Sequence, residues 1–142
     1  MMAEFTLKEH TADVAVEATG ADLGATFAAV ADGLTAAMCD DWPAADAPDG
    51  GERTEIRVVA ESPEAVLYDY LDELIYERDV RAVLPVDNAA SVEENGEWTV
   101  DGSYRAVPLS AVVARDVKAV TYSEMSLERV DGGWEAYVVF DV

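Results

Sequence analysis

The sequence predicts an α+β fold, a single domain over residues 1–142 in which two long helices pack against a largely antiparallel mixed β-sheet. Three observations support this fold class. The chain has 142 residues, a length that suits one hydrophobic core. Two stretches repeat apolar residues every three or four positions, as one face of a helix does. Most other segments alternate apolar and polar residues between turn-forming residues, as strands do.

The first third of the chain is expected to form two strands and a helix. Phe5–Glu9 and Val14–Ala18 alternate as strands do, and His10-Thr11-Ala12-Asp13 lies at the turn or strand end between them. A helix should follow over Ala21–Cys39, with Asp22 as its N-cap. Its apolar stripe consists of Leu23, Phe27, Val30, Leu34 and Met38.

A loop, a strand and a second helix should come next. Residues 40–51 are rich in Asp, Ala, Pro and Gly, which predicts a loop, and Glu55–Ala60 is typical of a strand. Ser62 is an expected helix cap with Pro63 at the first helical position, and the helix should end near Arg78-Asp79. Its buried face is predicted to comprise Leu67, Tyr70, Leu71, Leu74 and Ile75.

From Arg81 onward the sequence is typical of strands joined by tight turns. Asn95-Gly96 and Asp131-Gly132-Gly133 suit hairpin turns, and the hairpin from Ser126–Val130 to Trp134–Val138 is the clearest of them. The predicted strands are Ala82–Val86, Ala90–Glu93, Trp98–Ala106, Val117–Tyr122, Met125–Val130 and Trp134–Phe140.

The composition is strongly acidic. The formal net charge is −21, from 30 acids against 9 bases, and only Lys8 and Lys118 are lysines. An acidic surface that binds a partner or mimics nucleic acid is one interpretation. The favoured one is adaptation to high salt, where carboxylates keep the surface hydrated and salt screens their repulsion. Binding to duplex DNA is not expected, because it requires basic residues that neutralise phosphates.

Several features narrow the cellular setting. No apolar run is long enough to span a membrane, and the N-terminal residues lack a basic region followed by an apolar one. A soluble, cytoplasmic protein without membrane contact is therefore expected. Cys39 is the only cysteine, which excludes an internal disulfide, and its apolar helical surroundings predict a core residue.

The most informative residues lie near the two ends of the chain. Asp13 and Asp141 are hard oxygen donors of the kind that Ca²⁺ and Mg²⁺ prefer, and the terminal carboxylate of Val142 is a further candidate. His10 is the only histidine and suits a softer metal. From spacing alone, each has an ordinary alternative: a hydrogen-bonded structural histidine, a turn residue and a solvated terminal acid. Lys118 would either pair with a carboxylate or phosphate, or be a plain surface lysine.

Common catalytic motifs are missing from the sequence. It contains no Gly-rich phosphate loop and no Gly-x-Ser-x-Gly motif. A cysteine–histidine pair would have to join Cys39 to His10, although Cys39 belongs to the core-facing helix. Little in the sequence therefore points to a nucleophilic enzyme.

Taken together, the motifs resemble the archease family, whose members are small protein partners of RtcB-type RNA-splicing ligases. The resemblance spans essentially the whole chain in order and spacing. It rests on His10–Asp13, the helix after Gly20, Leu67–Ile75, Lys118–Tyr122, Met125–Glu128, Gly133-Trp134 and Phe140–Val142.

The resemblance implies a site and a function. It assigns Asp13, Asp141 and the terminal Val142 to a divalent-metal site, with Ca²⁺ as the expected ion and Mg²⁺ or Mn²⁺ as alternatives. It makes Lys118 a functional lysine and leaves His10 as an additional candidate ligand. The implied activity is non-catalytic stimulation of an RtcB-type ligase, through its guanylylation and multiple turnover in joining tRNA halves. Contact with tRNA would be indirect, through the ligase.

Two other functions and two departures from the family pattern remain open. The alternatives are a chaperone or adaptor for RNA-processing enzymes, and a metal-dependent hydrolase that uses Asp13 and Asp141. Val14-Ala15 stands where the family often has Ile-Gly, and Ser123 stands where it usually has His, followed by Glu124. A role for that second histidine is therefore not expected here.

Overall fold

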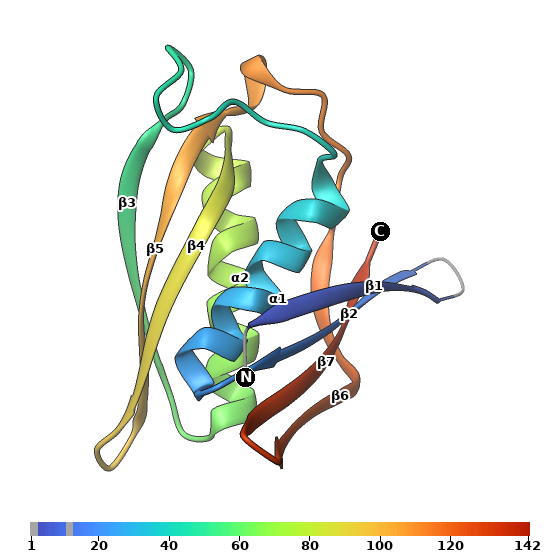
Figure 1. Cartoon of the computed structure of the whole chain (residues 1–142), viewed down its shortest axis with the longest axis vertical. Helices are drawn as coiled ribbons and strands as arrows, with labels where there is room; N and C mark the ends of the chain where they lie inside the picture. Colours follow the sequence, from blue (N-terminus) through green and yellow to red (C-terminus); the bar gives the residue numbers. More distant parts are fainter. Residues whose placement is uncertain (1–2, 11–12) are drawn as a thin grey trace.

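The computed structural model describes residues 3–10 and 13–142, without the side chains of residues 8–10 (Figure 1). It contains two long helices and seven strands in the order β1-β2-α1-β3-α2-β4-β5-β6-β7, with a short 3₁₀ helix, η1, after β5. The predicted α+β class is confirmed. The elements are β1 (Glu4–His10), β2 (Asp13–Gly20), α1 (Leu23–Met38), β3 (Glu52–Ala60), α2 (Pro63–Arg81), β4 (Val83–Glu94), β5 (Trp98–Pro108), η1 (Leu109–Ala111), β6 (Ala119–Val130) and β7 (Gly133–Asp141).

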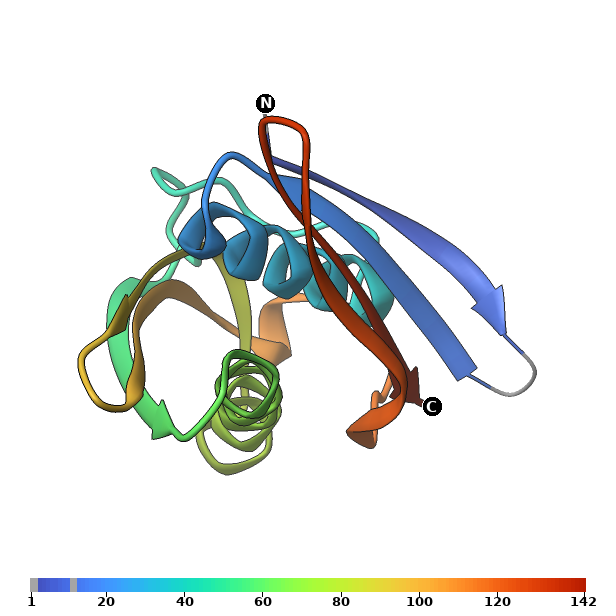
Figure 2. The ribbon, with the colours of Figure 1, turned by 90° about the horizontal axis from the view of Figure 1, so that it is seen from below.

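The strands form two sheets rather than the one mixed sheet that the sequence suggested. One has the order β1-β2-β7-β6 and the other β3-β5-β4, and every paired strand in the described part of the chain is antiparallel. Helix α1 lies between the two sheets and contacts β2 on one side and β4 on the other (Figure 2). Alanines and glycines on α1 allow this two-sided burial, whereas the apolar stripe of the sequence accounted for one face only.

Both helices begin where their capping residues predict. The Asp22 carboxylate accepts a hydrogen bond from the Ala25 N–H at 2.7 Å, and the Ser62 hydroxyl accepts one from the Ala65 N–H at 3.1 Å. Helix α2 continues to Arg81, past the predicted end near Arg78-Asp79, and stops where Ala82 adopts a left-handed φ of 55°. Cys39 is buried at the end of α1, as expected. No helix in the described ranges has the length and apolarity to cross a membrane.

Two pairs of predicted strands are in fact single strands, each interrupted by a bulge. In β4 the register shifts between Val86 and Ala89, and in β6 it shifts between Thr121 and Ser126. The polar residues at these breaks are typical of turns, but here they supply the positive φ of a bulge, 49° at Asp87 and 61° at Glu124. The two predicted hairpin turns are confirmed at Gly96 and Gly132.

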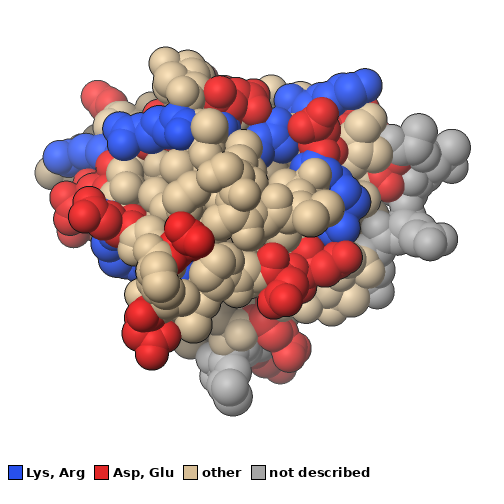
Figure 3. Space-filling view, turned by 90° about the horizontal axis from the view of Figure 1, so that it is seen from above, with Lys and Arg blue, Asp and Glu red and all other residues tan. Residues whose placement is uncertain are grey.

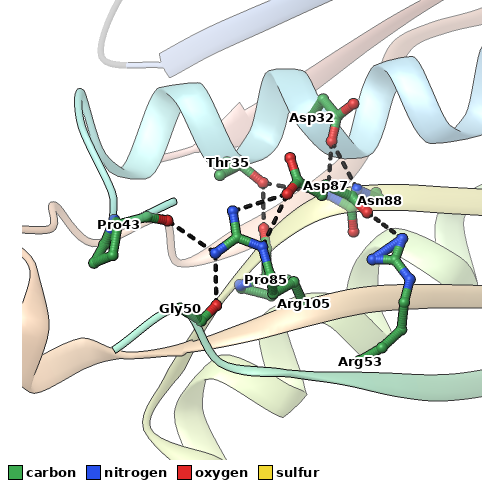
Figure 4. A network of polar contacts seen from close by, with 9 residues as sticks. All are labelled: Asp32, Thr35, Pro43, Gly50, Arg53, Pro85, Asp87, Asn88 and Arg105. Atoms are coloured by element: carbon green, nitrogen blue, oxygen red, sulfur yellow. Dashed lines mark hydrogen bonds and ion pairs between the residues drawn. The ribbon is translucent and has the colours of Figure 1, made fainter. Parts of the chain in front are cut away.

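The loop over residues 40–51 is held against the three-stranded sheet by a buried arginine (Figure 4). The Arg105 guanidinium donates to the carbonyl oxygens of Pro43, at 2.8 Å, and Gly50, at 2.5 Å. It also pairs with the Asp87 carboxylate at 2.8 Å. A loop without regular structure is thereby fixed to β5 and to the β4 bulge.

The other side of the β4 bulge is bound to α1. The Asp32 carboxylate accepts hydrogen bonds from the Asn88 backbone N–H at 3.0 Å and from its side-chain amide at 2.9 Å. Thr35 donates to the Pro85 carbonyl at 2.5 Å. Burial raises the pKa of Asp32, although the hydrogen bonds from Asn88 oppose that rise. These contacts set the position of α1 between the sheets.

Gly24 tests how closely α1 approaches β4. A Cβ atom at this position would lie 2.4 Å from the Ala90 carbonyl oxygen, which belongs to the backbone. Helix propensity alone would make Gly24→Ala stabilising by about 1 kcal/mol. Because the backbone must shift, we expect the free energy of unfolding to fall by about 1–3 kcal/mol in urea denaturation. The control, Ala28→Gly on the same helix, measures the ordinary difference in unfolding free energy between alanine and glycine. If Gly24→Ala instead raised the free energy of unfolding, the backbone contact at Gly24 would be shown to yield easily.

Candidate functional site

The start of β2 and the end of β7 lie at the same end of the four-stranded sheet. Asp13, the first residue of β2, pairs directly with Asp141, the last residue of β7. His10 is the register partner of Asp13 in β1, and Ala119 is the partner of Asp141 in β6. The strand register therefore places these residues in one row across all four strands, whose arrangement Figure 1 shows.

The carboxylates of Asp13 and Asp141 project to the same face, because opposite residues of an antiparallel pair do so. Like charges at such positions destabilise a sheet unless another group compensates them. Asp13 is half-buried and Asp141 is exposed, so both lie where a solvent-borne ligand can reach the row. Two hard oxygen donors side by side are suited to a cation that retains several waters.

Lys118 joins this row through its backbone. Its N–H donates to the Asp141 carbonyl oxygen at 2.8 Å, which extends the β6–β7 pairing by one residue beyond Ala119. The lysine itself is exposed, and Val142 at the chain end is 41% exposed. A cationic side chain and the terminal carboxylate thus lie at the same end of the sheet as the aspartates.

Arg115 fixes the segment that leads to Lys118. Its guanidinium donates to the carbonyl oxygens of Ala36 and Ala37, both at 3.1 Å, at the C-terminus of α1. It also bonds the Asp40 carboxylate at 2.9 Å, and this bond lowers the pKa of Asp40. A cation at a helix C-terminus satisfies carbonyls that lack partners and opposes the helix dipole. Residues 112–118 are therefore anchored to α1.

Arg78 holds the next point of the same segment from α2. It is buried, and its guanidinium donates to the Val117 carbonyl oxygen at 3.1 Å. A second nitrogen lies 3.3 Å from the Met38 sulfur, and a bond to Asp79 at 2.7 Å completes its contacts. Val117 is fully buried, so this bond fixes the residue directly before Lys118.

The metal ligands named from the sequence are thus brought to one end of the sheet, but the ligation itself stays a prediction. Within the described residues, no three side chains of His, Cys, Asp or Glu form a ligand group. The side chain of His10 lies outside the described residues, as do Thr11 and Ala12 of the same motif. Ser123 and Glu124, which depart from the family pattern, lie in the β6 bulge and are exposed.

Sequence reasoning missed the two arginines that support the site. The sequence predicts only that Arg78 lies near the end of a helix, and it predicts no role for Arg115. Only the composition points to such roles, since few arginines are present in so acidic a chain. Their acceptors are backbone carbonyls distant in sequence, which no local pattern specifies.

Arg78→Met tests the anchoring of Lys118. The variant keeps an unbranched apolar chain but leaves the buried Val117 carbonyl without its donor, which costs about 1–3 kcal/mol of unfolding free energy. We also expect faster hydrogen exchange at the Lys118 N–H. Arg57→Met is the matched control, because the exposed Arg57–Asp101 pair, at 3.6 Å, contributes at most about 1 kcal/mol. Equal losses in the two variants would contradict the anchoring role.

Comparison with known proteins agrees with this architecture. The model of the archease protein family matches residues 5–142. Protein archease of Pyrococcus furiosus is 31% identical over 139 residues, covering 94% of this chain and 95% of the relative. Its counterpart in Thermococcus kodakarensis is 34% identical over 139 residues, with the same coverage of both chains.

Solved structures show the same fold. The solution structure of Methanobacterium thermoautotrophicum protein 1598 has a TM-score of 0.76 at 24% identity and covers 97% of this chain and 98% of its own. The crystal structure of a Thermotoga maritima protein, named an archease and possible chaperone, has a TM-score of 0.62 at 22% identity, covering 95% and 94%. With the family model matching nearly its whole length, the chain belongs to the archease family.

Proposed function

We propose that this protein is a non-catalytic activator of a cytoplasmic RtcB-type RNA ligase, promoting ligase guanylylation and multiple turnover in the joining of tRNA halves. One observation supports the proposal above others. Asp13 is the cross-strand partner of Asp141, and Lys118 bonds to the backbone of the same aspartate, so charged residues from three separate segments of the chain meet. Because the chain belongs to the archease family, we expect this charged end to contact a protein partner.

The chemistry of the site suits phosphoryl transfer. Asp13, Asp141 and the terminal carboxylate of Val142 would hold a divalent cation, with Ca²⁺ expected and Mg²⁺ or Mn²⁺ as alternatives. His10 is a further candidate ligand. When bound, such a cation would supply positive charge that stabilises a reacting phosphoryl group. The Lys118 ammonium, at the same end of the sheet, would add a second positive charge.

The remaining residues of the site act by positioning these charges. Arg78 and Arg115 fix the segment before Lys118, and the β6–β7 pairing fixes Asp141. Electrostatic stabilisation is most effective when the charges need no rearrangement at the moment of reaction. A role of this kind requires no nucleophile from the activator, since the ligase would provide the reacting group.

A chaperone or adaptor function is the second candidate. The Thermotoga maritima neighbour is named a possible chaperone, and this observation favours the alternative. The two functions differ in scope. A chaperone should suppress aggregation of unrelated proteins, whereas the proposed activator should act on one RNA ligase and depend on Asp13 and Asp141.

Multiple-turnover RNA ligation tests the proposed activation. Asp13→Ala and Asp141→Ala are each expected to abolish stimulation of the cognate ligase while circular dichroism and melting temperature show a folded domain. Lys118→Ala should weaken stimulation without changing cation binding. Asp131→Ala is the matched control, because Asp131 is an exposed acid at the opposite end of the same sheet. Full stimulation by both aspartate variants would refute the role of this site.

Cation binding can be measured without the ligase. At about 100 times its dissociation constant, a bound ion should add about 2.7 kcal/mol to the free energy of unfolding. We expect Ca²⁺ to raise the melting temperature at constant ionic strength, and the rise to disappear in Asp13→Ala but persist in Asp131→Ala. Equal rises in both variants would indicate general screening of the acidic surface.

A further inference from the structure

A stacked tyrosine pair lies beside the candidate site. The rings of Tyr68, on α2, and Tyr122, on β6, have centroids 4.2 Å apart and planes 7° from parallel. Tyr122 is nevertheless 55% exposed, so one ring face rests on Tyr68 while much of the ring remains open to solvent. An exposed aromatic ring held rigidly in this way is a ready contact surface, because little side-chain entropy is lost on binding.

The fold explains why this pair is open. β6 is the edge strand of the four-stranded sheet, so no neighbouring strand covers its outer side. Tyr122 is two residues beyond the buried Val120 and shares its face, which is the face that α2 contacts. The regular pairing with β7 ends at Thr121, so Tyr122 is the first residue of the β6 bulge.

Two carboxylates act electrostatically on the pair. The pKa of Tyr122 is raised by partial desolvation, and further by Asp69, Tyr68 and Glu61. Asp69 and Glu61 are exposed, and neither takes part in an ion pair among the described residues. An open aromatic face flanked by unpaired carboxylates favours a cation that can both stack and donate hydrogen bonds.

We propose that Tyr122 and Tyr68, together with Asp69 and Glu61, form a docking point for an arginine side chain of the protein partner. A guanidinium stacks on tyrosine faces and donates hydrogen bonds to carboxylates in its plane, which an ammonium does less well. Tyrosine and arginine are both enriched among residues that dominate binding at interfaces. The net charge of −21 further favours a basic partner surface.

The docking point deepens the proposed function and rests on it for the identity of the partner. Tyr122 is four residues from Lys118 on the same chain segment, a span of roughly 13 Å at about 3.3 Å per residue. A partner that covers this edge of the four-stranded sheet would therefore span both the Lys118 end and the tyrosine pair. A nucleic-acid strand fits less well, because Asp69 and Glu61 would repel its phosphates.

Binding to the cognate ligase tests this docking point with a closely matched control. In calorimetry, Tyr122→Ala should raise the dissociation constant about tenfold. Tyr122→Phe, which keeps the ring, should bind like the unchanged protein. Tyr76→Ala is the control, because Tyr76 lies on α2 and is also 55% exposed. Tyr122→Ala binding as tightly as Tyr76→Ala would overturn the proposal. If the unchanged protein does not bind the ligase, the proposed function fails instead.

A second measurement needs no ligase. N-acetyl-arginine amide is titrated while the ring resonances of Tyr122 are followed by NMR, with the uncharged isostere N-acetyl-citrulline amide as the reference. We expect shifts with the arginine probe that are largely lost in Asp69→Asn, and little response to citrulline. Equal responses to both probes, or a stronger response to a single-stranded oligonucleotide, would overturn the proposal whatever the ligase does.

Discussion

The antiparallel pairing of β2 with β7 is the contact on which the rest of the structure depends. It runs from Asp13–Asp141 to Gly20–Trp134 and joins the first part of the chain to its last strand. In its middle, Val16 opposes Val138 and Ala18 opposes Ala136, all buried against α1. The hydrophobic burial that stabilises this ladder also brings two aspartates together at its end. The charged site therefore depends on core packing rather than on its own interactions.

Three arginines of this acidic chain connect separate elements of the fold. Arg105 joins a loop to a sheet, Arg115 joins a loop to the end of α1, and Arg78 joins α2 to the segment before β6. Their main acceptors are backbone carbonyls, and those of Gly50 and Val117 are buried, where a carbonyl without a donor would be costly. Lys118 is different, because the bond that joins it to the sheet comes from its backbone N–H and not from its side chain. Its ammonium group therefore has no structural task among the described residues and can contact a partner at the charged end.

The local parts of this fold could be predicted from the sequence, and the non-local parts could not. Asp22 and Ser62 mark the helix starts because a cap acts within three residues, and the Gly96 and Gly132 turns are equally local. The division into two sheets depends on which strands α1 meets, and bulges at Asp87 and Glu124 resemble turns in sequence. Asp13, Asp141 and Lys118 were recognised by family resemblance. Their meeting at one end of the sheet needed the strand register.

The segment from Lys118 to Tyr122 fixes the spacing between the two proposed contact points. Lys118 bonds the Asp141 carbonyl at 2.8 Å, and the Thr121 hydroxyl donates to the Val139 carbonyl at 3.1 Å. Tyr122, the first residue of the bulge, then stacks on Tyr68 of α2. The segment is thus fixed to β7 as far as Thr121 and to α2 at Tyr122. A partner would meet a charged end and an aromatic pair at a set spacing, so both contacts can form without rearranging this segment.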